Sequence, residues 1–307
     1  MEAREASTSA RALTGERHTP LGAGQKSILA ILCIGAGILA LSPRYVPGGL
    51  VQVAYGVLVC AIFLALALVA RRRASLRRFW ELPFAFFILS IFVVLDNTVP
   101  GYFGRYVLHS PPVAGDPLAS TAGASVLVQL VELVIAVVVV LGLTRAFGGD
   151  LDSLYLRPGR VGRALVIGVA GFVVFYALAA LQLSSRIFPT SGPVSLHRYL
   201  ALTPALLVVA LSNGFLEELV FRGLFLRKYN AFFGPYLSNV LQAMIFALAH
   251  VGVAYTPFAL LFIVFVVFPL GLLAGYLMRS SNGIVASSLF HAGADIPIYL
   301  AFLSYVA

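Results

Sequence analysis

Long runs of consecutive apolar residues alternate with short polar segments along almost the whole chain. The runs lie near residues 27–42, 50–70, 82–95, 124–144, 164–183, 200–221, 237–250, 258–278 and 284–304. A helix needs about 20 mostly apolar residues to cross a bilayer, and most of these runs approach that length. The pattern predicts an all-α fold, a polytopic transmembrane helix bundle with eight or nine spans. The runs 82–95 and 237–250 are short, so they must either include flanking residues or form half-buried helices.

The composition supports the same fold class. Of the 307 residues, 60% are hydrophobic and 11% are charged, whereas soluble domains contain about 25% charged residues. The net charge is +9, but the cations cluster in short loops between apolar runs, where they orient helices and contact lipid headgroups. We therefore expect the lipid bilayer as a partner and no nucleic acid. Cys33 and Cys60 lie inside apolar runs and are expected to be small packing residues.

The distribution of positive charge predicts an orientation. With nine spans and an inside N-terminus, all Lys and Arg residues fall in inside segments except Arg44, Arg105, Arg186 and Arg198. Because cytoplasmic loops carry the excess of Lys and Arg, we expect a cytoplasmic N-terminus in a multi-pass protein of the cell membrane (plasma or inner membrane).

The polar segments divide the chain into four regions. Residues 1–25 are predicted to be a disordered cytoplasmic tail, 26–145 the N-terminal membrane helices, 146–163 a basic cytoplasmic linker, and 164–307 a C-terminal core. The proline-rich segment 96–123 is predicted to be an irregular loop. Pro43, directly after the first run, favours an uncleaved anchor over a signal peptide.

Ionisable residues within the apolar runs concentrate in the last helices. Carboxylates are costly inside a membrane and usually mark a functional site. Spacings of four residues place the members of each pair on one helical face, so convergence of three such faces would create one polar pocket. The set consists of Glu217, Glu218, Arg222, Phe246, His250, His291 and Asp295.

Each of these residues also has a purely structural explanation. Glu218 and Arg222 could be an ion pair within one helix, and His250 a hydrogen-bonded packing residue. His291 and Asp295 could form a local hydrogen bond. Taken together, however, a buried carboxylate beside a histidine can act as a general base that deprotonates a water molecule. The set as a whole therefore favours a catalytic site.

Three motifs carry a resemblance to a known family. EELVFR at 217–222, FALAH at 246–250 and HAGAD at 291–295 match EExxxR, FxxxH and HxxxN/D in order and spacing. In these motifs the chain resembles the CPBP family, also called the Abi family, of CAAX proteases and bacteriocin-processing enzymes. These are prokaryotic relatives of the type II CAAX-prenyl endopeptidase. The resemblance implies an intramembrane endopeptidase that cleaves a membrane-associated protein or peptide, with its active site in the C-terminal helices.

The resemblance also implies roles for the residues. Glu217 and His250 would activate the water, and His291 with Asp295 would lie on the oxyanion side. Glu218, Arg222 and Phe246 would support this arrangement. Many relatives have Asn where this chain has Asp295, and an ionised Asp cannot donate to an oxyanion. We therefore expect Asp295 to accept a hydrogen bond from His291 and to fix its tautomer.

The sequence is compatible with either a zinc-dependent or a metal-free mechanism. Glu217, His250 and His291 are residue types that can bind zinc, so a zinc site is one alternative. The chain lacks HExxH, which favours a metal-free glutamate mechanism without a cofactor.

Two functions from other classes stay open. A proton-coupled transporter would use intramembrane Glu and His residues as a relay, although no internal repeat is visible in the chain. A non-catalytic membrane scaffold or immunity protein would keep the motifs without turnover. Glu132, in an earlier run, has no partner motif and is expected to make a polar contact within its span.

Overall fold

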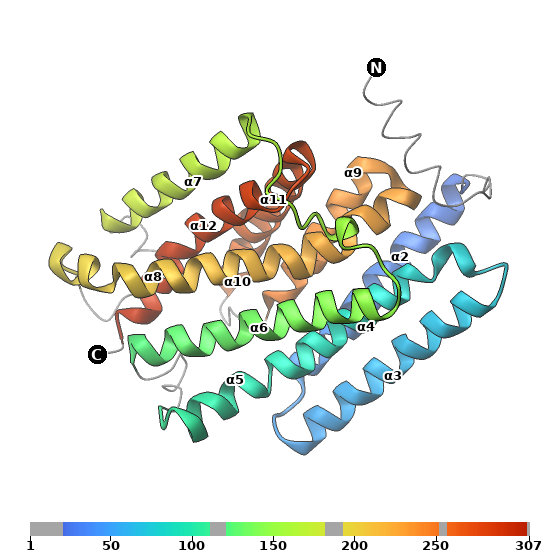
Figure 1. Ribbon diagram of the computed structural model, residues 1–307, viewed down its shortest axis with the longest axis horizontal. Helices are drawn as coiled ribbons and strands as arrows, with labels where there is room; N and C mark the ends of the chain where they lie inside the picture. The colour runs from blue at the N-terminus through green and yellow to red at the C-terminus, as the bar shows by residue number, and fades with distance from the viewer. Residues whose placement is uncertain (1–20, 111–120, 182–192, 252–256, 306–307) are drawn as a thin grey trace.

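The protein is an all-α bundle. The computed structural model describes residues 21–110, 121–181, 193–251 and 257–305, and these residues contain helices and connecting turns but no strand. Eight helical segments are long and apolar enough to cross a membrane, which confirms the predicted polytopic bundle. Its helices are α2 (Ala23–Leu41), α3 (Leu50–Arg72), α4 (Glu81–Asp96), α5 (Val99–Tyr102), α6 (Ala122–Ala146), α7 (Arg163–Ala180), α8 (Leu196–Glu217), α9 (Leu224–Ala249), α10 (Pro257–Phe262), α11 (Phe268–Ser281) and α12 (Val285–Leu303) (Figure 1).

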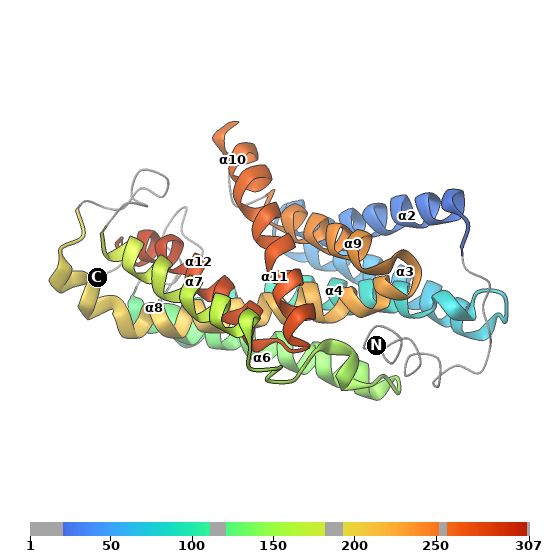
Figure 2. The ribbon, with the colours of Figure 1, turned by 90° about the horizontal axis from the view of Figure 1, so that it is seen from above.

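The helices pack as neighbours in a defined order. Helix α12 packs against α7 and α8, α6 packs against α8, and α3 packs against α4. Helices α10 and α11 are joined through a π-helical stretch, Ile263–Val267, and Figure 2 shows this rod crossing the other helices steeply. Helix α11 packs on both α9 and α12, so it connects the two helices that carry the predicted histidines.

Two of the nine apolar runs belong to one helical segment that reverses direction. The runs 200–221 and 237–250 both lie in the 54-residue segment Leu196–Ala249. As a straight helix it would be about 80 Å long, far more than the roughly 30 Å of a bilayer core. The backbone breaks at Gly234, which has φ 74° and ψ 175° and is followed by Pro235.

This reversal forms a hairpin with arms of similar length. Glu217 lies 17 residues before Gly234, and His250 lies 16 residues after it. A continuous helix would separate Glu217 and His250 by about 50 Å, whereas their side chains lie 3.7 Å apart. The hairpin therefore returns the second arm to the depth of the first.

The N-terminal boundaries differ from the predicted ones. Helix α2 begins at Ala23, inside the predicted tail 1–25, whose residues 1–20 lie outside the described part of the chain. The predicted loop 96–123 is helical at its start, because α5 and the π-helical stretch Phe103–Val107 continue the short run 82–95. Pro100 does not prevent this, since a proline in the first turn of a helix removes an amide that has no partner there. Residues 111–120 of that loop are not described.

The main hydrophobic core crosses the predicted boundary at 146–163. It includes Cys33 of α2, Phe86 of α4, and Phe225 and Phe246 of α9. The rings of Phe86 and Phe225 contact each other in a tilted arrangement, with centroids 5.0 Å apart. The N-terminal helices and the C-terminal core are thus packed through one continuous core.

Small residues permit two close helix contacts. A Cβ atom at Gly214 of α8 would lie 2.7 Å from the backbone nitrogen of Ala292 in α12, and one at Gly275 of α11 would lie 1.9 Å from Asn239 Oδ1 in α9. Only glycine allows backbones to approach this closely. Gly271 of α11 also lies close to α9, where a Cβ atom would come within 3.1 Å of Ala243.

The conformation of Gly234 generates a stability prediction. At φ 74° and ψ 175° an alanine is strained, so Gly234→Ala should lower the free energy of unfolding by about 1–3 kcal/mol. Gly142→Ala in α6 is the control, since a Cβ there would contact nothing within 4 Å. Thermal unfolding of the purified variants checks this. Equal stability of the two variants would show that the hairpin does not require glycine.

Candidate active site

The predicted site residues converge where α8, α9 and α12 meet. Glu217 Oε2 lies 3.7 Å from His250 Nε2 and 3.4 Å from His291 Nε2. His291 Nε2 lies 3.7 Å from Asp295 Oδ1. The imidazoles of His250 and His291, 41 positions apart in the chain, therefore lie beside one carboxylate oxygen, Glu217 Oε2. Glu217 and His250 are partly exposed, with side chains 18% and 22% accessible.

The two adjacent glutamates occupy different environments. The segment from Glu218 to Gly223 is π-helical, a local widening that frequently occurs at functional sites. Glu218 is completely buried, while Glu217 is partly exposed. The helix thus presents one carboxylate to the packed interior and the other to the space between the two imidazoles.

Glu218 is the structural centre of the cluster. Its Oε1 forms an ion pair with Arg222 Nη1 at 3.0 Å and accepts a hydrogen bond from His291 Nδ1 at 2.9 Å. A carboxylate paired with a guanidinium accepts hydrogen bonds only, so Nδ1 of His291 carries the hydrogen and Nε2 is directed to Glu217 and Asp295. This corrects the expectation that Asp295 fixes the His291 tautomer, since Glu218 holds the other ring nitrogen at hydrogen-bond distance.

Asp295 is held by a residue that the sequence analysis missed. Asn213 Nδ2 donates to Asp295 Oδ2 at 3.0 Å. A signal for Asn213 was available, because it is a polar residue in an apolar run and lies four residues before Glu217, on the same helical face. The amide places the Asp295 carboxylate beside His291.

Phe246 connects the polar groups. Its carbonyl accepts from His250 Nδ1 at 2.8 Å, which leaves His250 Nε2 facing Glu217 as an acceptor. The guanidinium of Arg222 lies 3.9 Å from the centroid of the Phe246 ring, a cation–π contact. The ring also meets His291 edge to face, with centroids 5.4 Å apart.

The N-terminal helices hold the end of α9 that carries His250. Arg44 Nη1 donates to the Ala249 carbonyl at 3.4 Å, and the Tyr45 hydroxyl donates to the Leu248 carbonyl at 2.9 Å. Arg44 is in turn paired with Asp96 at 2.9 Å. The last carbonyls of a helix have no partner within it and favour a cation. From the sequence, Arg44 was expected to be only a loop cation, and its contact with α9 was not predicted.

One further polar residue, Arg222, lies elsewhere than expected. Arg222 was counted among the cations of an inside loop, but its side chain is completely buried against Glu218. It therefore does not contribute to the charge of that loop. Glu132 lies in α6, three residues after Gln129, whose Oε1 accepts from Tyr299 of α12 at 3.4 Å.

The arrangement of Glu217, His250 and His291 bears on the zinc alternative. Among the described residues, no group of three or more His, Cys, Asp or Glu side chains is arranged to hold a metal ion. Glu217, His250 and His291 do meet, and Nδ1 of each histidine is engaged, by the Phe246 carbonyl and by Glu218 respectively, which is also usual for histidines that bind a metal through Nε2. Each histidine has only Nε2 left to face the Glu217 carboxylate.

Comparison with known proteins identifies the region that contains this cluster. Residues 199–297 match the family model described as type II CAAX prenyl endopeptidase Rce1-like. The match includes Glu217, His250, His291 and Asp295, and it confirms the predicted family resemblance over that segment. Arg44 and Asp96 lie outside the matched residues. No curated protein and no solved structure matches the chain.

The buried pair of Glu218 and Arg222 can be tested by a double-mutant cycle. Arg222→Met should cost about 3–5 kcal/mol of stability, because it leaves a buried carboxylate without its cation. The double variant Glu218→Leu with Arg222→Met should recover part of that loss, since both charges are removed together. Denaturant unfolding measures each step, with Arg145→Met at the exposed end of α6 as the control. A cost for Arg222→Met as small as that of the control would contradict a structural role for the pair.

Proposed function

We propose that this chain, Rce1-like over residues 199–297, is a multi-pass membrane endopeptidase that hydrolyses a peptide bond of a membrane-associated protein or peptide. The observation that carries the proposal is the position of Glu217 Oε2. It is buried, has no hydrogen-bond partner among the described residues, and lies within 3.4–3.7 Å of two imidazole nitrogens. Where polar atoms face each other at such a separation without a direct hydrogen bond, a water that contacts both is the bridge we propose.

Glu217 is the proposed base. A water held between Glu217 Oε2 and His250 Nε2 would donate one hydrogen bond to each acceptor. Transfer of one proton to Glu217 would make the water oxygen nucleophilic as it attacks the carbonyl carbon of the substrate. His250 is suited to orient this water, because its Nδ1 hydrogen is committed to the Phe246 carbonyl.

His291 is the proposed oxyanion donor. Its Nδ1 hydrogen is bonded to Glu218, so an additional hydrogen on Nε2 would point toward the centre of the site. A donor placed before the reaction stabilises the negative charge that develops on the carbonyl oxygen. Asp295 and Glu218, on either side of the ring, would stabilise the positively charged imidazole.

The remaining step is the collapse of the tetrahedral intermediate. The C–N bond breaks while the proton held by Glu217 passes to the leaving nitrogen. The products are a carboxylic acid and an amine, so one water is consumed and no oxidant, reductant or cofactor is required. Glu217 returns to its ionised form, ready for another water.

The substrate class follows from the location. The site lies within helices that are long and apolar enough to cross a membrane, so a substrate at the membrane reaches it more readily than a soluble protein.

The distribution of Lys and Arg supports a cytoplasmic N-terminus in a cell membrane. Cysteine labelling of residues 1–25 from each side of oriented vesicles would decide this orientation.

Replacement of the proposed base provides the direct test. Glu217→Gln should reduce turnover at least a hundredfold, within the 10²–10⁴ range of general-base catalysis, because the amide cannot accept the proton. Comparative peptidomics of membranes from cells making each variant measures the loss of cleaved termini. The matched control is Glu81→Gln, an exposed glutamate at the start of α4. Cleaved termini that persist at the wild-type level with Glu217→Gln would refute the proposed base.

Metal independence is tested separately. We expect a zinc chelator to leave the activity of the purified protein unchanged, because the proposed steps use side chains and water alone. A soluble zinc peptidase, which the chelator should inactivate, serves as the positive control. If the chelator abolishes activity and added zinc restores it, the metal-free mechanism is wrong, but the peptidase assignment still holds.

A further inference from the structure

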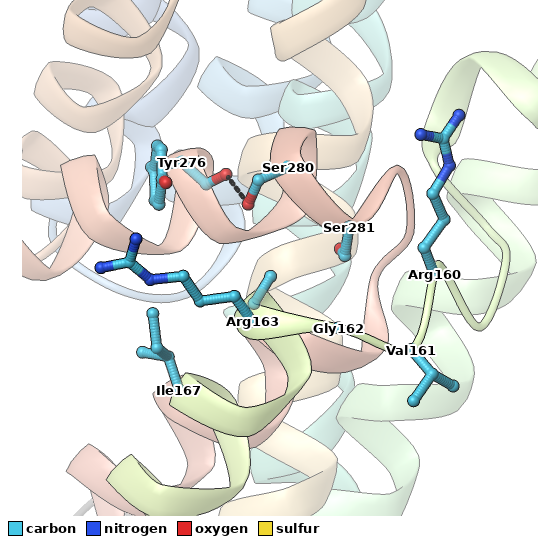
Figure 3. A pocket seen from close by; sticks show the side chains of 9 residues that line it. Arg160, Val161, Gly162, Arg163, Ile167, Tyr276, Ser280 and Ser281 are labelled. Carbon is cyan, nitrogen blue, oxygen red and sulfur yellow. Dashed lines mark hydrogen bonds between the residues drawn. The ribbon is translucent and has the colours of Figure 1, made fainter.

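A cavity lies apart from the Glu217 cluster, where α7 begins and α11 ends. Its volume is about 270 Å³, and its lining includes Arg160, Arg163, Ile167, Tyr276 and Ser280. Figure 3 shows Arg163 extending beside Tyr276 and Ile167, while the side chain of Arg160, on the opposite side of the cavity, points away from Arg163. None of the proposed catalytic residues lines it. The cavity thus has a cationic side chain on each of two sides.

The backbone around the cavity is fixed by hydrogen bonds. The amide of Arg160 donates to the Ser281 carbonyl at 2.7 Å, and the amide of Ile284 donates to the Arg157 carbonyl at 3.0 Å. Gly159, with φ 87°, allows the linker to pass close to Gly283. The segment that carries Arg160 is therefore held against the turn between α11 and α12, so the cavity is formed before any ligand arrives.

The two arginines differ from the other cations nearby. Arg157 is paired with Asp152, and its hydrogen bond lowers the pKa of that carboxyl group. Arg279 donates to the Pro235 carbonyl. In the described part of the chain, neither Arg160 nor Arg163 forms an ion pair with an acidic side chain. The charge of both arginines is thus available to an external anion.

The surroundings of the cavity are apolar and suited to lipid. It adjoins the ends of two candidate membrane spans, Arg163–Ala180 and Leu260–Ser281. Val161 is 90% exposed and Val166 is 65% exposed. Further along α7, Val169 and Val173 are also exposed. An exposed tyrosine, Tyr276, stands at the cavity, as aromatic residues commonly do at a membrane interface.

We propose that this cavity binds the phosphate headgroup of an anionic phospholipid. The headgroup would lie beside Arg163 and the first amides of α7, and the exposed side chain of Arg160 would turn toward it from the linker. One acyl chain would follow the exposed valines of α7. Basic pockets between helices at the membrane surface are suited to such headgroups, and a helix N-terminus favours a phosphate. The site is separate from the Glu217 cluster and does not depend on the proposed peptidase activity.

Native mass spectrometry of the full-length protein tests the proposal. Wild-type protein released from detergent with added phosphatidylglycerol should retain one lipid more strongly than it retains phosphatidylcholine. Arg160→Gln with Arg163→Gln should weaken this binding about thirtyfold, since each basic residue near an anionic surface contributes roughly a fivefold factor. The control removes two other exposed span-end arginines, with Arg72→Gln and Arg145→Gln, and should bind as the wild type does.

Two further measurements separate the outcomes. Arg160→Lys with Arg163→Lys keeps the charge and should retain most of the binding, which shows that any loss with glutamine is not caused by misfolding. Glycerol phosphate, added as a competitor without acyl chains, should displace the lipid only weakly. Equal lipid retention by the glutamine variant and the control would refute the site. Displacement by glycerol phosphate at the concentration of the lipid would refute a lipid as its ligand.

Discussion

A buried carboxylate with two partners organises this protein. Glu218 is completely enclosed, and a charged group in that position is tolerated only when it is paired and hydrogen-bonded. Arg222 supplies the charge from within the same helix, and His291 supplies a hydrogen bond from α12. Each partner is then constrained in turn: Arg222 lies on the face of Phe246, and His291 keeps one tautomer. The orientation of the groups around Glu217 follows from this buried set.

Two backbone features make that arrangement possible. The break at Gly234 folds a 54-residue helical segment into a hairpin, which returns His250 to the depth of Glu217. The lack of a side chain at Gly214 allows α8 and α12 to approach until His291 reaches Glu218. Neither glycine belongs to a catalytic motif, yet the motifs could not meet without them.

The N-terminal helices contribute to the site although they lie outside the segment that matches the family. Arg44 and Tyr45 bind the last carbonyls of α9, next to His250, and Asp96 holds Arg44 from α4. The core packing of Phe86 on Phe225 joins the same two parts of the chain. These contacts give the N-terminal helices a physical role: they fix the end of the helix on which one of the two imidazoles stands.

The sequence by itself determined the fold class and identified most residues of the candidate site. Runs of apolar residues specify membrane helices because a helix must be about 20 mostly apolar residues long to cross the hydrocarbon core of a bilayer. Ionisable residues within such runs stand out because their burial is costly. Local spacing also identified Glu218 with Arg222, since i and i+4 always share a helical face. Asn213 was visible by the same spacing rule, although it was overlooked.

Only the tertiary structure decided which groups meet across helices. The sequence assigned the His291 tautomer to Asp295, its neighbour one turn away, whereas Glu218 on another helix holds the ring nitrogen. Arg44 looked like a loop cation, and its contact with Ala249 spans 205 positions in the chain. Such pairings depend on how closely two helices pack and on the chain reversal at Gly234. Neither can be read from the periodicity of residues within a single helix.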